Sequence, residues 1–185
     1  MVFFTLLFSA LFTQTDPDVF RRHLIELLPR LRRFARTLTA SSSDADDLVQ
    51  AACERALSRR EQFQEGTRMD SWMFRIIHTL RLDEVKSGRN RAVHFSFEEQ
   101  CDGWNEESDD QQRLEARMML ERVMRAMESL SPTDRAVLGL VCIDDMSYKE
   151  AAATLDIPIG TLMSRLARAR MRLMALVNNG SGSAA

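Results

Sequence analysis

Residues 147–173 read SYKEAAATLDIPIGTLMSRLARARMRL, and their pattern indicates two helices joined by a tight break. The first helix is predicted over 147–155 and the second over 160–177, with Asp156-Ile157-Pro158 between them. A helix-turn-helix has this arrangement, and it lays its second helix in the major groove of DNA. The last thirteen positions of the stretch hold four arginines and no acidic residue, which suits a surface that faces phosphates. The stretch therefore predicts a DNA-reading module.

The second predicted helix has two unlike faces when its residues are placed at about 100° per position. Its apolar stripe consists of Leu162, Leu166, Ala169, Leu173 and Leu176. The opposite face is polar and basic, and the helix starts at Gly160-Thr161, where free N–H groups can meet a phosphate. Arginine makes bidentate contacts with guanine or phosphate, and serine hydrogen-bonds either kind of acceptor. The candidate DNA contacts are Lys149, Thr161, Ser164, Arg165, Arg168 and Arg172.

The rest of the chain also shows helical periodicity, and no stretch alternates as a strand would. The predicted helices span about 19–38, 41–57, 69–86, 114–130 and 132–141. In the 69–86 helix, Trp72 and its apolar neighbours are expected to face the core, whereas Arg75 and His78 face away from it. In the 114–130 helix, Leu114 and Met118 begin the apolar side. The predicted fold class is therefore all-α.

The charge distribution divides these helices into two modules. The net charge is only −2, but residues 96–110 contain seven acidic residues and no basic one, so the remainder is net positive. That segment is poor in branched apolar residues, and we interpret it as an acidic, flexible linker. The predicted division is an N-terminal extension at 1–15, a first helical module at 16–95, a linker at 96–112, a second helical module at 113–177 and a flexible tail at 178–185.

Several classes of protein are disfavoured by the residue types present. Cys53, Cys101 and Cys142 lie far apart with no histidine at ligand spacing, so no metal site or cofactor is predicted. No nucleophile with a paired base and no glycine-rich phosphate loop is present, so we predict no catalytic residue. The apolar start MVFFTLLFSALFTQT is too short to span a bilayer, which takes about 20 residues. Scattered thiols suit a reducing compartment, and we expect a cytoplasmic protein.

SYKEAAATLDIPIGTLMSRLARAR resembles the C-terminal helix-turn-helix of the extracytoplasmic-function sigma factors, the compact two-domain members of the bacterial sigma family. The preceding LSPTDRAVLGLV is similar to the family's adjoining segment. Upstream, DADDLVQAACERAL resembles its polymerase-binding helix, and SWMFRIIHTLRLDEVKSGRNR its promoter-melting segment. The resemblance covers about residues 16–177. Within the family, DPDVFRRHLIELLPRLRRFARTL is most similar to the general-stress-response branch of alphaproteobacteria.

The resemblance implies a protein that binds core RNA polymerase and directs promoter-specific initiation, of stress-response genes in that branch. The implied polymerase contacts are Asp46, Asp47, Gln50 and Glu54. The C-terminal module is expected to bind the double-stranded upstream promoter element. The implied contacts to locally melted promoter DNA are Phe63, Arg68, Arg75, His78, Thr79, Lys86, Arg89 and Arg91. The acidic linker is expected to be either a solvated tether that lets the two modules span two promoter elements or, as in the family, a segment that runs through the polymerase. An anti-sigma factor is a further expected partner.

Three positions depart from the family pattern. Asp156 replaces the usual turn glycine, although aspartate tolerates a left-handed conformation better than most residues do. Met163 stands where lysine or arginine is usual, and Thr79 where asparagine is common.

Two other interpretations of the function stay open. The chain is alternatively a sigma-like mimic that sequesters an anti-sigma factor, or a stand-alone helix-turn-helix regulator.

Overall fold

The computed structural model describes residues 16–88 and 110–179, and every regular element within these ranges is helical. The N-terminal module consists of α2 (Pro17–Leu38), α3 (Ser42–Ser58), a short 3₁₀ turn (Arg60–Gln62) and α4 (Met69–Lys86). The C-terminal module consists of α5 (Asp110–Glu128), α6 (Pro132–Leu138), a π-helical segment (Gly139–Ile143), α7 (Tyr148–Leu155) and α8 (Ile159–Asn179). The prediction of an all-α fold with two helical modules is confirmed.

Short polar side chains fix where several of these helices begin. The Ser41 and Ser131 hydroxyls accept hydrogen bonds from backbone N–H groups three residues further on, at 3.0 and 3.2 Å. In α7, the Ser147 hydroxyl accepts from the Glu150 N–H at 3.3 Å, and the Glu150 carboxylate accepts from the Ser147 N–H at 3.0 Å. This capping box satisfies N–H groups that a helix start leaves without partners. The capping box thus fixes the start of α7 directly after Ser147.

The break between α7 and α8 depends on one backbone conformation. The backbone of Asp156 is left-handed, with φ 56° and ψ 47°. This is the conformation expected of a residue that stands in place of a turn glycine. The Ile157 N–H then donates to the Ala152 carbonyl at 3.1 Å, which closes the end of α7. Pro158 follows, and α8 starts one residue later. The two helices of the predicted helix-turn-helix are thereby set at their angle.

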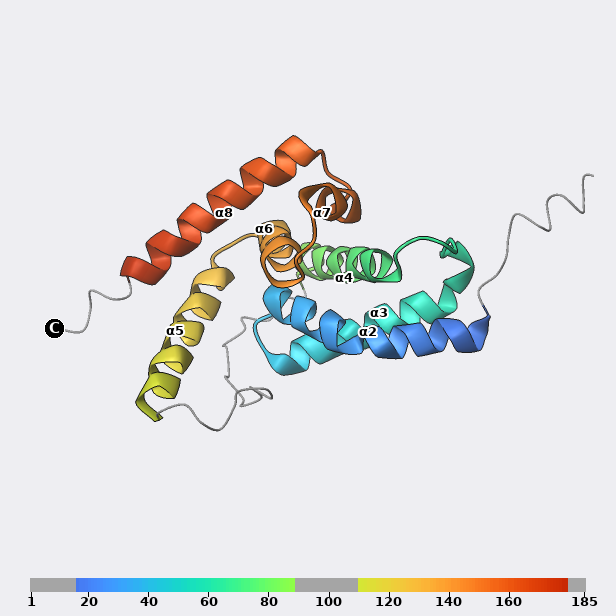
Figure 1. Ribbon diagram of the computed structural model, residues 1–185, viewed down its shortest axis with the longest axis horizontal. Coiled ribbons are helices and arrows are strands. Elements are labelled where there is room, and N and C mark those ends of the chain that lie inside the picture. The colour runs from blue at the N-terminus through green and yellow to red at the C-terminus, as the bar shows by residue number, and fades with distance from the viewer. Residues whose placement is uncertain (1–15, 89–109, 180–185) are drawn as a thin grey trace, which may run out of the picture.

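The two modules pack directly on each other and share one continuous hydrophobic core among the described residues. Helices α2 and α3 lie side by side, α4 packs on both, and α6 and α7 contact the free side of α4 (Figure 1). Phe34 and Phe74 of the first module are fully buried, with ring centroids 4.8 Å apart, and Val137 and Leu140 of the second are fully buried too. The core therefore crosses the boundary between the modules.

Some expectations need correction, and others concern positions outside the described residues. His78 does not face away from the core, because only 6% of it is exposed. Leu114 and Met118 do begin the apolar periodicity of their helix, and in the structure they are 59% and 46% exposed. Helix α5 begins at Asp110, so the last positions of the predicted linker are helical. The N-terminal extension, most of the linker, Arg89, Arg91 and the end of the tail lie outside the described residues.

Candidate nucleic-acid and protein interfaces

Helix α8 presents its predicted DNA face to the outside of the molecule. Its apolar stripe is anchored by Leu162, Leu166 and Ala169, each at most 3% exposed. On the other side Ser164, Arg168 and Arg172 are exposed, as is Lys149 on α7, and Thr161 is half-buried. Helix α7 contacts both α4 and α8, and α8 extends from it along the outer side of the C-terminal module (Figure 1). The polar face of α8 is therefore accessible in this conformation.

Two positions on α8, Arg165 and Met163, do not add a free positive charge to its polar face. Arg165 is tied to α6, since its Nη1 donates to Asp134 Oδ1 at 2.9 Å. This ion pair joins the start of α6 to the helix-turn-helix, so Arg165 also positions α8. Met163, which stands where the sigma-factor resemblance leads one to expect a basic residue, is 50% exposed. Its thioether carries no charge to attract a phosphate.

The loop before α4 and the start of α4 carry the predicted contacts to melted DNA. Phe63 is half-buried, with its ring centroid 5.9 Å from that of Phe20 and 5.4 Å from that of Trp72. Arg68, which precedes α4, donates from Nε and Nη2 to the two oxygens of Asp70 at 3.1 and 2.6 Å. Arg68 Nη1 also donates to the Glu150 carboxylate of the C-terminal module. This arginine is therefore already engaged.

Further along α4, the predicted DNA contacts have different surroundings. Arg75 donates to the Thr154 and Ala153 carbonyls at 3.1 and 2.6 Å, so it is also held by the C-terminal module. Thr79 and Lys86 are exposed. His78, on the same side of α4 as Arg75 by helical spacing, is buried, and burial lowers its pKa to about 4. The imidazole is therefore neutral near pH 7.

The predicted polymerase contacts form an exposed row along α3. Asp46, Asp47, Gln50 and Glu54 are all exposed. Two of them interact within the row, where Gln50 Nε2 donates to Glu54 Oε1 at 3.0 Å. Arg32 of α2 donates to Asp46 at 3.1 Å, but both side chains are about 60% exposed, so this pair adds little stability. The row is available to a basic partner.

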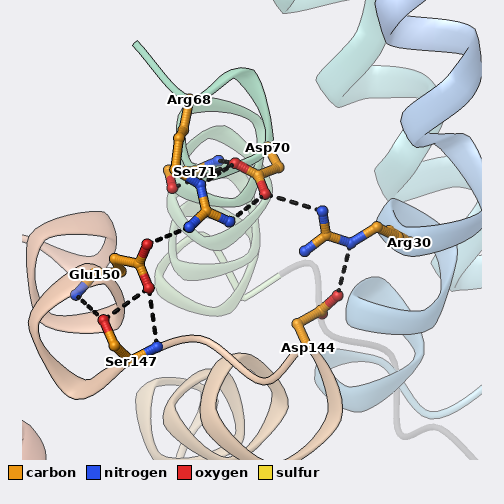
Figure 2. A network of polar contacts seen from close by, with 7 residues as sticks. All are labelled: Arg30, Arg68, Asp70, Ser71, Asp144, Ser147 and Glu150. Carbon is orange, nitrogen blue, oxygen red and sulfur yellow. Dashed lines mark hydrogen bonds and ion pairs between the residues drawn. The ribbon is translucent and has the colours of Figure 1, made fainter.

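A partly buried ionic network between the modules was not predicted from the sequence (Figure 2). Arg30 of α2 donates from Nη1 to Asp70 at 2.9 Å and from Nε to Asp144 at 3.2 Å. Burial alone would raise the pKa of Asp70, but hydrogen bonds from Arg68, the Ser71 N–H and Arg30 lower it overall. Burial raises the pKa of Asp144, and its contact with Arg30 only partly offsets this effect. No periodicity marks these residues, because their partners lie far away in sequence.

The described part of the chain offers neither a group of metal ligands nor a membrane-spanning helix. Within residues 16–88 and 110–179, no group of histidine, cysteine, aspartate or glutamate residues is arranged to hold a metal ion. None of the helices in those ranges is both long and apolar enough to cross a membrane.

Comparison with known proteins gives matches over both modules. The family model described as "Sigma2 domain of PhyR" matches residues 24–78, and the one described as "Sigma-70, region 4" matches residues 120–173. A protein of Rhodopseudomonas palustris named "ECF RNA polymerase sigma factor EcfG" is 34% identical over 161 residues, which cover 86% of each chain.

Solved structures agree with these matches. The sigma factor RpoE of Bartonella quintana, in complex with the anti-sigma factor NepR, superposes with a TM-score of 0.65 at 28% identity. That match covers 86% of this chain and 96% of the other. CnrH, in complex with the cytosolic domain of CnrY, gives a TM-score of 0.63 at 25% identity and covers 89% of this chain and 91% of the other.

Proposed function

This chain belongs to the extracytoplasmic-function family of RNA polymerase sigma factors. From that membership we propose which of its surfaces bind promoter DNA and which bind core polymerase. It is a sigma factor that directs promoter-specific transcription initiation. The observation that carries this conclusion is the 34% identity to a sigma factor over 86% of both chains. Sigma factors are not enzymes, so the chain contributes recognition surfaces rather than catalytic residues.

We assign the upstream promoter element to the polar face of α8. Ser164, Arg168 and Arg172 are exposed together on one side of the helix, with Lys149 on the neighbouring α7. Arginine and serine side chains suit the base edges and phosphates of a major groove. The apolar stripe of α8 holds this face outward by packing on the rest of the C-terminal module.

We assign the melted promoter segment to the loop at 63–68 and to the adjoining side of α4. Phe63 and Trp72 belong to an aromatic cluster on which an unstacked base can pack. Arg68, Arg75 and Lys86 supply the positive charge that a separated strand attracts. Core polymerase is assigned to the acidic row on α3, because its carboxylates are exposed and suit a basic partner.

We further propose control by an anti-sigma factor in the cytoplasm, and a role in a stress response. Two solved sigma factors with the fold of this chain are held by the anti-sigma factor NepR and by the cytosolic domain of CnrY. A pull-down of the tagged protein from unstressed cells should recover a stoichiometric partner besides polymerase. Recovery of polymerase alone would contradict this proposal.

Run-off transcription with purified core polymerase on genomic fragments tests the main function. The chain should confer initiation at discrete promoters, because it has both modules and an accessible α8. Core polymerase without the chain is the control. Stable binding to core with no initiation on any fragment would contradict the assignment.

A sigma-like mimic is the second candidate, and one observation favours it. The N-terminal module matches the family model named for PhyR, and a solved PhyR is described as an anti-anti-sigma factor complexed with NepR. That structure is 18% identical to this chain, so it shows the fold alone. A mimic has no need of a DNA-reading helix, whereas α8 keeps its exposed arginines. The run-off experiment separates the two functions.

A further inference from the structure

The exposed side of α2 carries a basic row that has no part in the proposed function. The row consists of Arg22, Ile25, Pro29, Arg32 and Arg36. These residues recur at alternating intervals of three and four positions, so they lie along one face of the helix. Arg36 is half-buried and the others are exposed, with 65% of Ile25 exposed. The row contains three arginines and no acidic residue, so it attracts negative groups.

Beside it, the acidic row of α3 has the same spacing and the opposite charge. Asp47, Gln50 and Glu54 follow one another at intervals of three and four positions, and Leu57 continues the series. Leu57 is 43% exposed although it is apolar. The exposed side of the α2–α3 pair therefore sets a positive helix beside a negative one, and each helix adds an exposed apolar side chain.

The two rows stand at matching heights along the module. Helices α2 and α3 lie side by side and run in opposite directions, because only a short connection joins them (Figure 1). Arg32 Nε donates to Asp46 Oδ1 at 3.1 Å, which places these two residues level with each other. Both helices rise by about 1.5 Å per residue, so Arg22, ten positions before Arg32, is level with the part of α3 between Glu54 and Leu57. Basic and acidic side chains therefore occupy equal heights.

We propose that this side of α2 and α3 binds a second copy of the chain. A two-fold axis parallel to the helices lays α2 of each copy over α3 of the other, and residues at equal heights then face each other. Arg22 meets Glu54 of the second copy, and Arg32 meets Asp47 of the second copy. A two-fold axis across the helices would instead lay α2 on α2, with arginine against arginine. Charge complementarity therefore selects the axis parallel to the helices.

Exposed apolar side chains lie within this contact. Ile25 is level with Cys53, so it stands within about one helical turn of Leu57 of the second copy. Covering these two apolar side chains removes their surface from water, which adds a favourable contribution that ionic contacts alone would not supply. The remaining contacts are ionic and lie at the surface, so salt weakens them. We therefore expect a transient dimer that is most stable at low ionic strength.

The dimer covers the acidic row of both copies. Under the proposed function this row receives core polymerase, so a second copy of the chain and polymerase compete for one surface. Only the monomer then binds core, and the fraction of monomer falls as the concentration of free chain rises. This consequence rests on the proposed function, whereas the dimer itself rests on the two rows alone.

Analytical ultracentrifugation of the full chain without polymerase tests the dimer. Between about 5 and about 500 µM protein in dilute salt, the average mass should rise from that of one chain toward that of two. Raising the salt concentration from about 0.05 to about 0.5 M should weaken the dimer about tenfold, because the facing charges are screened. A mass that stays at that of one chain at every concentration would overturn the proposal.

An exchange of charges tests whether the contact lies on α2 and α3. The variant Arg22→Glu, Arg32→Glu makes the basic row negative, and the variant Asp47→Arg, Glu54→Arg makes the acidic row positive. Each variant alone should dimerise at least about thirtyfold more weakly than the unchanged chain, because like charges then face each other. An equimolar mixture of the two should dimerise again, since each negative row meets a positive one. Arg22→Lys, Arg32→Lys is the matched control, and it should dimerise because it keeps the charge.

Circular dichroism checks the helix content of every variant. If a charge-reversal variant loses its helices, Ile25→Gln replaces it. This single change should weaken the dimer about fivefold, because it removes the apolar contact with Leu57 of the second copy. A dimer that persists in both charge-reversal variants, or that their mixture does not restore, would overturn the placement on α2 and α3.

Binding to core polymerase separates this inference from the proposed function. Arg22→Glu, Arg32→Glu should bind core at least as tightly as the unchanged chain, because its acidic row is intact and uncovered. If the mixture dimerises and Asp47→Arg, Glu54→Arg still binds core, the dimer stands and the polymerase assignment is wrong. If no protein dimerises and Asp47→Arg, Glu54→Arg fails to bind core, the proposed function stands and only the dimer is wrong.

Discussion

Arg168 and Arg172 lie one turn apart on the exposed face of α8, and we expect them to play different parts in DNA binding. Arg168 is near the middle of that face, beside Ser164, where a side chain reaches base edges. Arg168→Ala should therefore cost about 1–3 kcal/mol in binding and relax preference at one or two base pairs. Arg172→Ala should weaken binding evenly across sequences and lower the salt slope by about one. Titrations on native and scrambled upstream elements at several salt concentrations measure both effects.

The two variants serve as controls for each other, because each removes one guanidinium from the same helix face. A loss of sequence preference in Arg172→Ala with none in Arg168→Ala would reverse the assignment. Unchanged preference in both would mean that α8 does not read bases in this register.

His78 gives a prediction about acid stability. The unfolded imidazole takes up a proton as pH falls through about 6.5, whereas the buried one stays neutral down to about 4. Between these values the unfolded state binds more protons, so the free energy of unfolding decreases as pH falls. The unchanged chain should lose about 2–3 kcal/mol more than His78→Gln between pH 7 and pH 4.5.

Urea unfolding of both proteins at the two pH values measures this difference. Carboxylates titrate in the same range, but they are common to both proteins and cancel in the comparison. Equal losses in the two proteins would show that His78 is not buried as a neutral group.

Helix α3 should bind core polymerase through the negative charge of its exposed carboxylates. The paired change Asp47→Arg, Glu54→Arg should abolish binding to core, because like charges facing each other cost several kcal/mol. Both side chains are exposed, so the helix itself should persist. Co-purification with core polymerase measures binding, and circular dichroism measures helix content.

The matched control for α3 reverses two charges elsewhere. Glu26→Arg on α2 with Asp83→Arg on α4 makes the same change in net charge at two exposed positions. This control should keep its binding to core. If both double variants bind core as the unchanged chain does, the polymerase interface is not on α3.

For the whole molecule, the shared core predicts how the chain unfolds. Phe34, Phe74 and Leu140 belong to one buried cluster that crosses both modules, so neither module should unfold alone. Urea denaturation followed by circular dichroism and by Trp72 fluorescence, in a Trp104→Phe background, should give coincident transitions. Gly139→Ala should separate them, because the added methyl group would press on Thr37 and Phe34 of α2 and weaken the contact between the modules. Separate transitions in the unchanged chain would contradict a shared core.

The local sequence pattern was enough to predict most of the helices and the polar face of α8. Ser131-Pro132, the apolar stripe through Leu162 and Leu166, and the break at Asp156 each act within a few residues of chain, so their outcomes follow from local chemistry. The prediction that His78 faces away from the core was wrong, because its burial depends on helices far away in sequence. Its side of α4 looked polar beside Arg75, and it is buried in the folded molecule, where α6 and α7 pack on α4.

Residue spacing along short stretches of the chain accounts for the all-α class, the helix-turn-helix, the exposed arginine face of α8 and the acidic row on α3, since each depends on neighbours close in sequence. Packing between the modules, by contrast, places Arg68 and Arg75 against α7, Arg30 between Asp70 and Asp144, and Gly139 against α2. These contacts join residues roughly 40 to 115 positions apart. No local propensity encodes them, because they form only when one packed module is laid on the other.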